Sequence, residues 1–480
     1  MTQQSIFQDW DEQKLRTAFQ DSEDIKVTTS PFGAKKEMFT LVYCEGMGDS
    51  KRLSDIVLPT LELVFREDGS DADSWTALQA RLELSELKMK EELATYLFSG
   101  SLLLFHHRSK RLYAHNIENI PKRNPSESTT EISLKGPRDG FTEELTSNVA
   151  LIRKRLRTAE LHNEKYTLGK HSRTEVALLY MEGRAQPALI QEMRDRLGAF
   201  QSEAVLSSSQ LEEGLGDAKT SLFPLVDYIG RPDYASQALI RGRLVVLVNG
   251  SPMALILPSN LLEQMKSPED LHLPYYFVAF ERALRVIGLF VAIFLPGFWV
   301  ALCAYNAEQL PFLLLATVAN SRIGLPLSIS IEAFIMLGMF EIFREAGVRL
   351  PKAVGQTIAV VGGLIVGDAA IRAGLTSPTL LVVSAITAVS TFTLVNYSLS
   401  GSVSVMRLFV LLGSSTLGMF GFFICMFAIL AYMSGLTSLG VGYLEPVSPV
   451  SFKDFLKSLL DVPKRWKDLK PNMLKRPNVK

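Results

Sequence analysis

The sequence predicts a soluble two-part N-terminal region of the α/β (α+β) class, followed by an α-helical domain that spans the membrane several times. The uneven distribution of charge indicates this division. Up to about residue 285 the chain is rich in Glu, Lys, Arg and Asp, whereas from 286 to 444 charged residues become rare and Leu, Val, Ile, Phe, Gly and Ala dominate. The N-terminus, "MTQQSIFQDWDEQK", is polar and lacks the apolar core of a secretory signal, so none is expected.

The composition argues against several classes of protein. The 50 basic and 50 acidic residues give a formal net charge of zero, so we expect no general attraction to nucleic acid. The three cysteines are far apart and form no CxxC pair. No phosphate-binding loop of the GxxxxGK form, no GxSxG and no HExxH is present. We therefore predict no enzyme activity, no cofactor and no metal site.

The first soluble part is predicted to cover residues 1–121. Residues 75–98 alternate apolar and charged side chains at helical spacing. The segment "SLLLFHHRSKRLYAHNI" then predicts two strands joined by a turn at 108–110. The polar stretch "IPKRNPSESTTE", at 120–131, predicts a linker that ends this part.

The second soluble part is predicted to be an α/β unit over residues 132–275. Apolar residues recur at helical spacing from Phe141 to Leu156, and Asp139 could cap that helix. Its basic end complements the helix dipole, with an anionic partner as the alternative. "TEVALLYMEG" predicts a strand, residues 187–197 a helix, and "RLVVLVNGSPMALIL" a β-hairpin around Asn249–Gly250.

Four apolar runs predict a membrane domain over residues 283–435. A helix needs about 20 apolar residues to span a bilayer, and the runs are 286–305, 356–371, 379–399 and 408–433. The last run is long enough to span with tilt, and Gly413, Gly418 and Gly421 could bend it or let another helix approach. Basic residues favour the cytoplasmic side, so Arg282 and Arg285 place the N-terminal region in the cytoplasm.

The chain after the last run is predicted to form a basic cytoplasmic tail over residues 445–480. It contains "FKDFLKSLL", which predicts an amphipathic helix at the membrane lipid or on a partner. With both ends inside, the number of crossings is even, and residues 310–350 form a re-entrant or pore-associated element. If residues 310–350 cross instead, the count becomes five and the tail lies outside.

Two carboxylates interrupt the segment "SISIEAFIMLGMFEIFREAG". A charged side chain at the bilayer centre costs about 2.5–3.5 kcal/mol, so such groups face protein or water. We expect Glu341 to mark a helix end and to pair with Arg344 or Arg349. For Glu332 two readings stay open: an ion pair with Arg322, or a position on an aqueous path.

The helix expected after this segment carries a stripe that could line a pore. The residues on one face, at spacings i, i+4, i+7 and i+11, are Thr357, Val361, Leu364 and Asp368. Polar ends around an aliphatic centre are typical of a pore that closes at a hydrophobic constriction. The alternative is that Asp368 pairs with Arg372 four residues later on an ordinary packed helix.

The neighbouring face of this helix favours close packing. Gly363 and Gly367 form a small-xxx-small pair, which allows two helices to approach. In a homo-oligomer, a ring of such helices would convert each single carboxylate into a charged ring, and such rings select cations.

Four long motifs together resemble the A subunit of the GerA-type spore germination receptors. They are "KGPRDGFTEELTSNVALIRKRLR", "RLVVLVNGSPMALILPS", "EIFREAGVRLPKAVGQTIAVVGGLIVGDAA" and "RWKDLKPNMLKRPN", and the similarity runs from about residue 27 to 478. The segment before "REAGVRLP" carries only Pro326 where the family has more prolines. Gly362–Gly363 also leaves a flexible point, so Val361 and Leu364 are our choice for the constriction.

The resemblance implies a role in nutrient-triggered germination, as a multi-pass protein of the spore inner membrane. It implies a permease-like B subunit that binds the nutrient and a lipoprotein C subunit as partners. It further implies a homo-oligomer that opens on nutrient binding and releases monovalent cations. The alternative is a non-conducting membrane scaffold that transmits the signal within the receptor.

Overall fold

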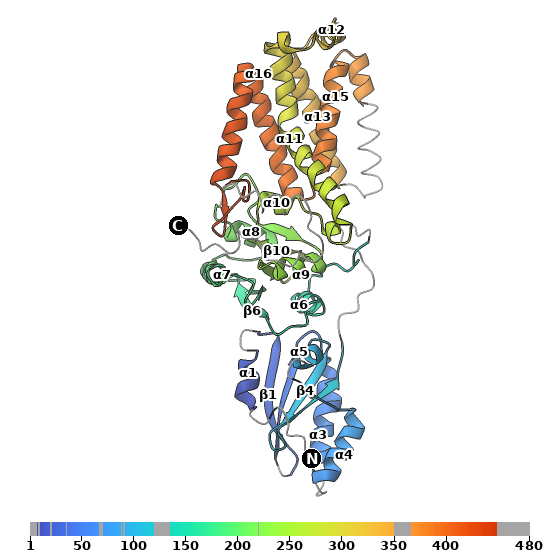
Figure 1. The fold of residues 1–480 in the computed structure, drawn as a ribbon, viewed down its shortest axis with the longest axis vertical. Helices are drawn as coiled ribbons and strands as arrows, with labels where there is room; N and C mark the ends of the chain where they lie inside the picture. Colours follow the sequence, from blue (N-terminus) through green and yellow to red (C-terminus); the bar gives the residue numbers. More distant parts are fainter. Residues whose placement is uncertain are drawn as a thin grey trace.

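The computed structural model describes residues 7, 10–19, 22–34, 36–66, 71–87, 89, 92–119, 135–218, 220–349 and 366–448. The molecule is elongated: one sheet lies at one end, a second sheet lies in the middle, and long helices form the other end (Figure 1). The predicted α/β character of the N-terminal region is confirmed by these two sheets.

The first sheet is antiparallel, with strand order β1-β2-β4-β5-β3. Its strands are β1 (Ile25–Phe32), β2 (Glu37–Cys44), β3 (Ser85–Glu86), β4 (Ser101–His106) and β5 (Arg111–Asn116). All six residues of β4 are buried, because helices cover both faces of the sheet. The helices are α1 (Glu12–Thr17), α2 (Ser50–Arg52), η1 (Leu53–Val57), α3 (Leu58–Arg66), α4 (Asp71–Leu82) and α5 (Glu92–Leu97).

The strand pair predicted around residues 108–110 is confirmed by β4 and β5, whereas the single helical stretch over 75–98 is wrong. The chain leaves α4 at Glu83, whose φ of 46° lies in the left-handed region, and then forms β3 before α5. A left-handed residue cannot continue a right-handed helix. The helix therefore ends after α4, although apolar residues recur at helical spacing on both sides of this break.

The second sheet is also antiparallel, with strand order β6-β7-β9-β10-β8. Its strands are β6 (Leu161–Leu168), β7 (Thr174–Met181), β8 (Asp227–Ile229), β9 (Leu244–Val248) and β10 (Ala254–Leu257). Helices on its two faces complete separate apolar cores. They are α6 (Leu145–Arg153), α7 (Pro187–Ala199), α8 (Ser208–Leu215) and α9 (Pro232–Ile240). Two short helices, α10 (Leu261–Gln264) and η2 (Pro268–Leu271), follow β10 and lead to the long helices.

The local predictions for this second sheet are confirmed with one correction. β7, α7 and the β9–β10 hairpin lie where the sequence predicts them, and Gly250 in the hairpin turn has a φ of +86° that suits glycine. The expected cap is wrong: Glu144 precedes α6, and Asp139 accepts two hydrogen bonds from Arg155 instead, each 2.6 Å long.

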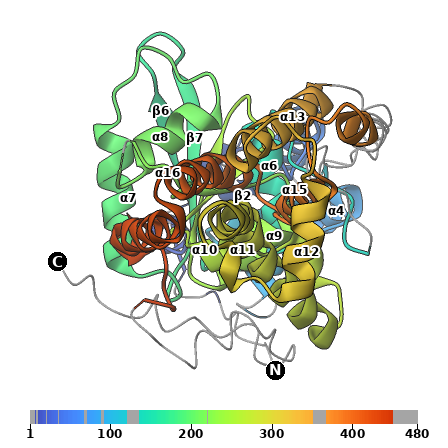
Figure 2. The ribbon, with the colours of Figure 1, turned by 90° about the horizontal axis from the view of Figure 1, so that it is seen from above.

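Long helices form the other end of the molecule. They are α11 (Tyr275–Tyr305), η3 (Ala307–Gln309), α12 (Phe312–Ser321), α13 (Ile329–Arg349), α15 (Pro378–Phe392) and α16 (Tyr397–Gly435), and residues 366–372 are helical as well. Viewed along the long axis, α11 lies between α16 and α15 (Figure 2). Among the described helices, α11 and α16 are long and apolar enough to cross a membrane.

The last predicted run, 408–433, is not one helix that crosses once. At Gly418 the backbone leaves the helical conformation, with φ 63° and ψ −140°, and α16 turns back on itself. Gly413 and Gly421 lie at the contact between the two arms, where an added Cβ would clash with Cys425 and with Gly413 respectively. The run 379–399 is likewise divided: α15 ends at Phe392, and the Asn396 side chain caps α16.

Residues 310–350 also differ from the expected re-entrant element. They form α12 and the 21-residue α13, which is about 31 Å long at the usual helical rise. Glu332 near the start of α13 contacts Ser377 before α15, and Arg344 near its end contacts Ser400 in the first turn of α16. α13 therefore extends along the whole bundle.

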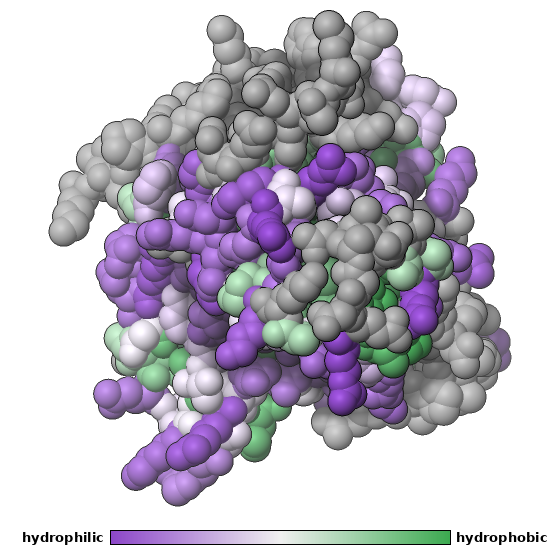
Figure 3. Space-filling view, turned by 90° about the horizontal axis from the view of Figure 1, so that it is seen from below, coloured by the Kyte–Doolittle hydropathy of each residue, from purple (hydrophilic) through white to green (hydrophobic). Residues whose placement is uncertain are grey.

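The two ends of the molecule differ in surface character. From the end that carries the first sheet, most of the described surface is hydrophilic (Figure 3). The long helices instead expose large apolar side chains, among them Ile287, Phe290, Val389, Leu412, Phe420 and Phe427. Apolar surface of this extent on helices of spanning length is typical of contact with lipid.

Candidate functional site

Of the four residues predicted to line a pore, the structure describes Asp368. Thr357, Val361, Leu364 and Gly363 lie outside the described residues, as does the predicted amphipathic helix of the tail. Asp368 pairs with Arg372 at 2.8 Å, and these side chains are 58% and 78% exposed. This contact matches the alternative prediction, in which Asp368 pairs with Arg372 four residues later on the same helix. Gly367 lies against α15, since a Cβ there would come within 3.3 Å of the methyl carbons of Leu381.

Glu332 is fully buried and has its partners within one copy of the chain. Its carboxylate lies 2.9 Å from the Arg322 guanidinium and accepts a hydrogen bond of 3.1 Å from the backbone N–H of Ser377. Of the two readings left open by the sequence, the contacts match the ion pair with Arg322. The carboxylate is thus neutralised at the end of the bundle remote from the sheets.

Glu341 belongs to a second ionic cluster, at the end of the bundle nearer the sheets. It pairs with Arg344 at 2.7 Å, as the sequence predicts, and also with Arg407 of α16. Arg407 is 3% exposed and donates to Thr391 at 3.0 Å and to Ser404 at 2.9 Å. Sequence reasoning missed Arg407, although a lone arginine inside an apolar run requires a buried partner.

A cavity of about 330 Å³ opens beside this cluster, between α13, α15 and α16. Arg344, Arg407 and Glu341 line it together with apolar side chains. The apolar part consists of Leu337, Phe340, Phe343, Ala385, Ala388, Val389 and Phe392. The wall therefore joins an apolar surface to a locally cationic group.

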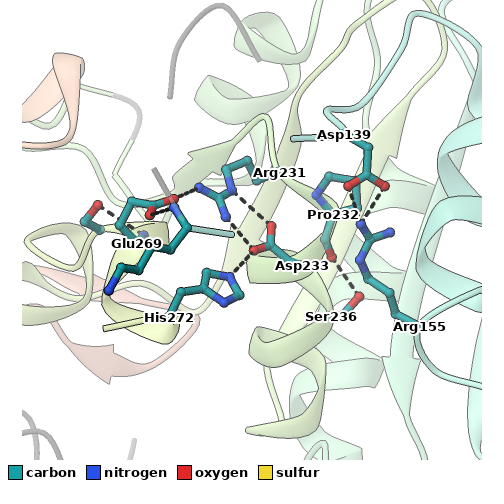
Figure 4. Close-up of polar contacts among 10 residues, drawn as sticks. Asp139, Arg155, Arg231, Pro232, Asp233, Ser236, Glu269 and His272 are labelled. Carbon is teal, nitrogen blue, oxygen red and sulfur yellow. Dashed lines mark hydrogen bonds and ion pairs between the residues drawn. The ribbon is translucent and has the colours of Figure 1, made fainter. Parts of the chain in front are cut away.

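A third network ties the second sheet to the base of α11. Arg231 is 1% exposed and pairs with Asp233 at 2.7 Å and with Glu269 (Figure 4). His272 contacts the same Asp233 at 2.9 Å. Burial raises the pKa of Asp233, but Arg231 and His272 outweigh it, so the pKa lies below its ordinary value. Gly136 packs against Arg231 and His272 with no room for a Cβ.

The adjoining contacts continue into α11 itself. Asp270 is 1% exposed and accepts hydrogen bonds from Arg282 at 2.9 Å and from Arg285 at 3.0 Å. The two arginines that the sequence assigns to the membrane boundary are therefore held by the soluble part. Because breaking a buried pair leaves an uncompensated charge, this arrangement fixes the base of α11.

Glu263 on α10, between the second sheet and the long helices, forms ion pairs with three cationic side chains. They are Lys266 at 2.6 Å, Arg243 at 3.2 Å and Arg241 at 3.3 Å. Burial raises the pKa of Glu263, but the three cations lower it well below the ordinary range. Burial lowers the pKa of Lys266 to about 8, because Glu263 offsets only part of the burial.

The chain beyond α16 returns to the second sheet. Leu439, between β11 (Thr437–Ser438) and β12 (Val441–Gly442), is buried in an apolar core of that sheet. Asp217 accepts hydrogen bonds from the Thr437 hydroxyl at 2.6 Å and from the Leu439 N–H at 3.0 Å. The end of α16 is thus fixed to the soluble region, as the start of α11 is.

The two sheets are joined by a buried arginine. Arg153, at the end of α6, pairs at 2.9 Å with Asp24, the residue before β1, and its guanidinium lies 4.4 Å from the Phe98 ring centre. Two basic residues at the end of this helix therefore have partners within the protein: Arg153 pairs with Asp24, and Arg155 pairs with Asp139. Within the described ranges, no three His, Cys, Asp or Glu side chains gather as a metal ion would require.

Comparison with known proteins gives a consistent set of similarities. The family model described as Bacillus/Clostridium GerA spore germination protein matches residues 13–473. "Spore germination protein XA" of Bacillus anthracis is 39% identical over 454 residues, which cover 94% of this chain and 92% of the relative. "Spore germination protein A1" of Bacillus subtilis is 30% identical over 441 residues, which cover 92% and 90%.

Among solved structures, the chain is similar to the N-terminal domain of the A subunit of the Bacillus megaterium spore germinant receptor GerK3. The sequence identity is 24% and the TM-score is 0.41, and the match covers 51% of this chain and 92% of that one.

Proposed function

The chain belongs to the GerA family of Bacillus/Clostridium spore germination proteins, and on this premise we propose that it is the A-type membrane subunit of a nutrient-responsive germination receptor. Its helical region is multi-pass and lies in the spore inner membrane, with the N-terminal region in the cytoplasm. Its partners are a permease-like B subunit that binds the nutrient and a lipoprotein C subunit.

The observation that carries this proposal is the fixed junction between the sheets and the helices. The start of α11 is held by Asp270 of η2, and the neighbouring Glu269 pairs with Arg231 after β8. The chain after α16 is held by Asp217, which follows α8. Movement of the soluble region would therefore be transmitted to both helices. This is the mechanical link that a signalling subunit needs.

The proposal includes assembly of several copies into a channel for monovalent cations. The stripe Thr357, Val361, Leu364 and Asp368 would line the channel, with Val361 and Leu364 as its constriction. Support comes from Asp368, whose carboxylate is more than half exposed in a single copy and is thus accessible to water or to a neighbouring copy. Gly367, close against α15, would keep the stripe helix packed.

A non-conducting scaffold is the second candidate. It is favoured by Glu332 and Glu341, because each is paired with arginine inside one copy. Their burial therefore creates no need for a watery passage. In this reading the partner subunit carries any transport. The role of Glu332 in an ion path stays a prediction without support from its contacts.

Ion flux separates the two candidates. The full chain, alone and with its B and C partners, would be reconstituted in liposomes loaded with a potassium-sensitive dye. The channel predicts flux that rises with nutrient, and leakage without nutrient in Val361→Ala or Leu364→Ala. A stable complex that passes no cations under any of these conditions would support the scaffold.

A further inference from the structure

The cavity between α13, α15 and α16 is used by neither candidate function, and it carries a donor that the protein leaves open. Arg407 is almost completely buried, and its Nη1 and Nη2 are hydrogen bonded. Its Nε has no hydrogen-bond partner among the described residues. An unpaired buried donor on a charged group is costly, and the side chain that carries it lines the cavity.

The charges around the cavity indicate the sign of that acceptor. The charged side chains that line the cavity are two arginines, Arg344 and Arg407, and one carboxylate, Glu341, so the lining itself carries one net positive charge. Guanidinium groups bind phosphate and carboxylate through several parallel hydrogen bonds. A ligand with an anionic group at this end of the cavity would neutralise the excess charge beside Arg344 and Arg407.

The rest of the wall fits an aliphatic chain. Ala385, Ala388 and Val389 of α15 form a smooth apolar strip next to the arginines, with Leu337 and Phe340 of α13 opposite. Val389 and Phe392 are each 65% exposed, so the cavity opens to the side of the bundle and not to its interior. An aliphatic chain that enters the cavity here would come from outside the helix bundle.

The height of the arginines in the bundle matches the headgroup level of a membrane. Arg407 donates to Thr391 at 3.0 Å, and Thr393, two residues later, lies against Gly288. Gly288 stands near the start of the apolar run 286–305 of α11. The guanidinium therefore lies within about one helical turn of the base of the apolar region, on the side of the soluble sheets.

We propose that this cavity is a binding site for an anionic phospholipid, with the phosphate at Arg344 and Arg407 and an acyl chain along Ala385, Ala388 and Val389. Basic pockets between helices on the cytoplasmic side are typical sites for anionic headgroups. Because the site lies where α13, α15 and α16 meet, the lipid adds to the links already made there by Glu341, Arg344 and Arg407. The inference rests on the membrane placement proposed above.

The test is lipid binding to the full chain in neutral detergent, measured by native mass spectrometry during titration. Dioleoylphosphatidylglycerol would be compared with dioleoylphosphatidylcholine, decanoate and inorganic phosphate. We expect the anionic phospholipid to bind at least about fivefold more tightly than the zwitterionic one, which corresponds to about 1 kcal/mol. Decanoate or phosphate that binds or competes as well as the phospholipid would contradict a lipid site.

Two variants and two matched controls locate the site. Arg344→Gln should weaken binding about fivefold. Arg322→Gln should not, although Arg322 has the same 24% side-chain exposure and also pairs with a glutamate of α13. Ala388→Phe fills the cavity with all charges kept and should weaken binding at least about tenfold, while the exposed Ala319→Phe on α12 should not.

The outcomes separate this inference from the proposed function. Flotation of the chain with liposomes tests the membrane placement alone. A chain that floats, but in which Ala388→Phe binds phosphatidylglycerol as tightly as wild type, overturns the lipid site and leaves the receptor role intact. If Arg344→Gln does not fold, Ala388→Phe still decides the matter.

Discussion

Arg153 in the N-terminal region and Arg407 in the helical region are both buried, but their hydrogen bonding differs. Arg153 is inaccessible, and all three of its guanidinium nitrogens donate, to Asp24, Ser22 and backbone carbonyls. Arg407 is nearly as buried, yet its Nε has no described partner. The first arrangement is complete within the chain. The second is not, and it differs from buried Arg243 of the N-terminal region, whose Nε also lacks a described partner, in lining a cavity.

This difference indicates what fully paired buried charges do. Arg153, together with Arg231 and Asp270 at the base of α11, fastens rigid parts to one another. Fully paired buried charges of this kind resist movement, because separation exposes an uncompensated ion.

The largest effect is expected from Arg153→Ala, which breaks the most complete of these networks. Asp24 would be left buried and unpaired, and breaking such a pair costs about 3–5 kcal/mol. Thermal unfolding of the detergent-solubilised chain, followed by circular dichroism, measures this loss. Arg16→Ala removes an exposed pair with Glu12 and should cost no more than about 0.5 kcal/mol. Equal losses of stability in the two variants would show that the buried Arg153 network stabilises the fold no more than an exposed ion pair does.

Glu332→Ala is expected to cost nearly as much, about 3 kcal/mol. It leaves Arg322 without its carboxylate and the Ser377 N–H without an acceptor. The same unfolding measurement applies, and Glu332→Gln, which keeps an acceptor for Ser377, should recover part of the loss. A fully stable Glu332→Ala variant would mean that the carboxylate is solvated, as a place on an aqueous path requires.

Glu212 gives a pH-dependent effect within the soluble region. Burial, aided by the neighbouring Glu213, raises the pKa of Glu212 to about 7. A carboxyl whose folded pKa is raised loses stability as pH rises, here between about pH 4.5 and 7, because the unfolded chain ionises first. The shift amounts to about 3 kcal/mol, and we expect about 2 kcal/mol because the group is not fully buried.

The variant Glu212→Gln removes this pH dependence. It should unfold at the same temperature as wild type near pH 4 and at a higher temperature at pH 8. A variant that is less stable than wild type at pH 8 would show that the ionised carboxylate is stabilised in the folded protein, contrary to its surroundings.

The smallest effect on stability is expected from Asp368→Asn. The pair with Arg372 is exposed and separated by four residues, so its loss should change the unfolding free energy by no more than about 0.5 kcal/mol. A change of cation flux or selectivity in this variant would then report on the ion path and not on folding. Unchanged flux and selectivity, in protein that conducts, would remove Asp368 from the path.

Local signals in the sequence predicted the soluble region better than the helical one. The Asn249–Gly250 turn and the apolar strand at Thr174–Met181 are short-range patterns, and both elements formed as expected. The glycines of the last apolar run, Gly413, Gly418 and Gly421, predict a bend or a close helix contact, but hydropathy does not distinguish a bend from the reversal that occurs at Gly418. The turn is held by a tertiary contact that the sequence does not reveal: the Tyr305 hydroxyl donates a hydrogen bond of 2.6 Å to the Ser415 carbonyl.

The candidate sites show the same limit. The pairs Glu341–Arg344 and Asp368–Arg372 lie three and four residues apart on one helix, so spacing alone predicts them. Arg407 and its cavity require α13, α15 and α16 to meet, and no periodicity encodes which helices are neighbours. The network around Arg231 likewise joins residues 38 positions apart.

Electron cryo-microscopy of the purified full chain in phosphatidylglycerol nanodiscs tests the central claim most directly. The account predicts several copies around an axis, with the segment that holds Thr357, Val361, Leu364 and Asp368 facing a central passage and the sheets fixed to α11 and α16 in every copy. Single copies, or a closed assembly in which Asp368 contacts only Arg372 and no passage exists, would contradict it.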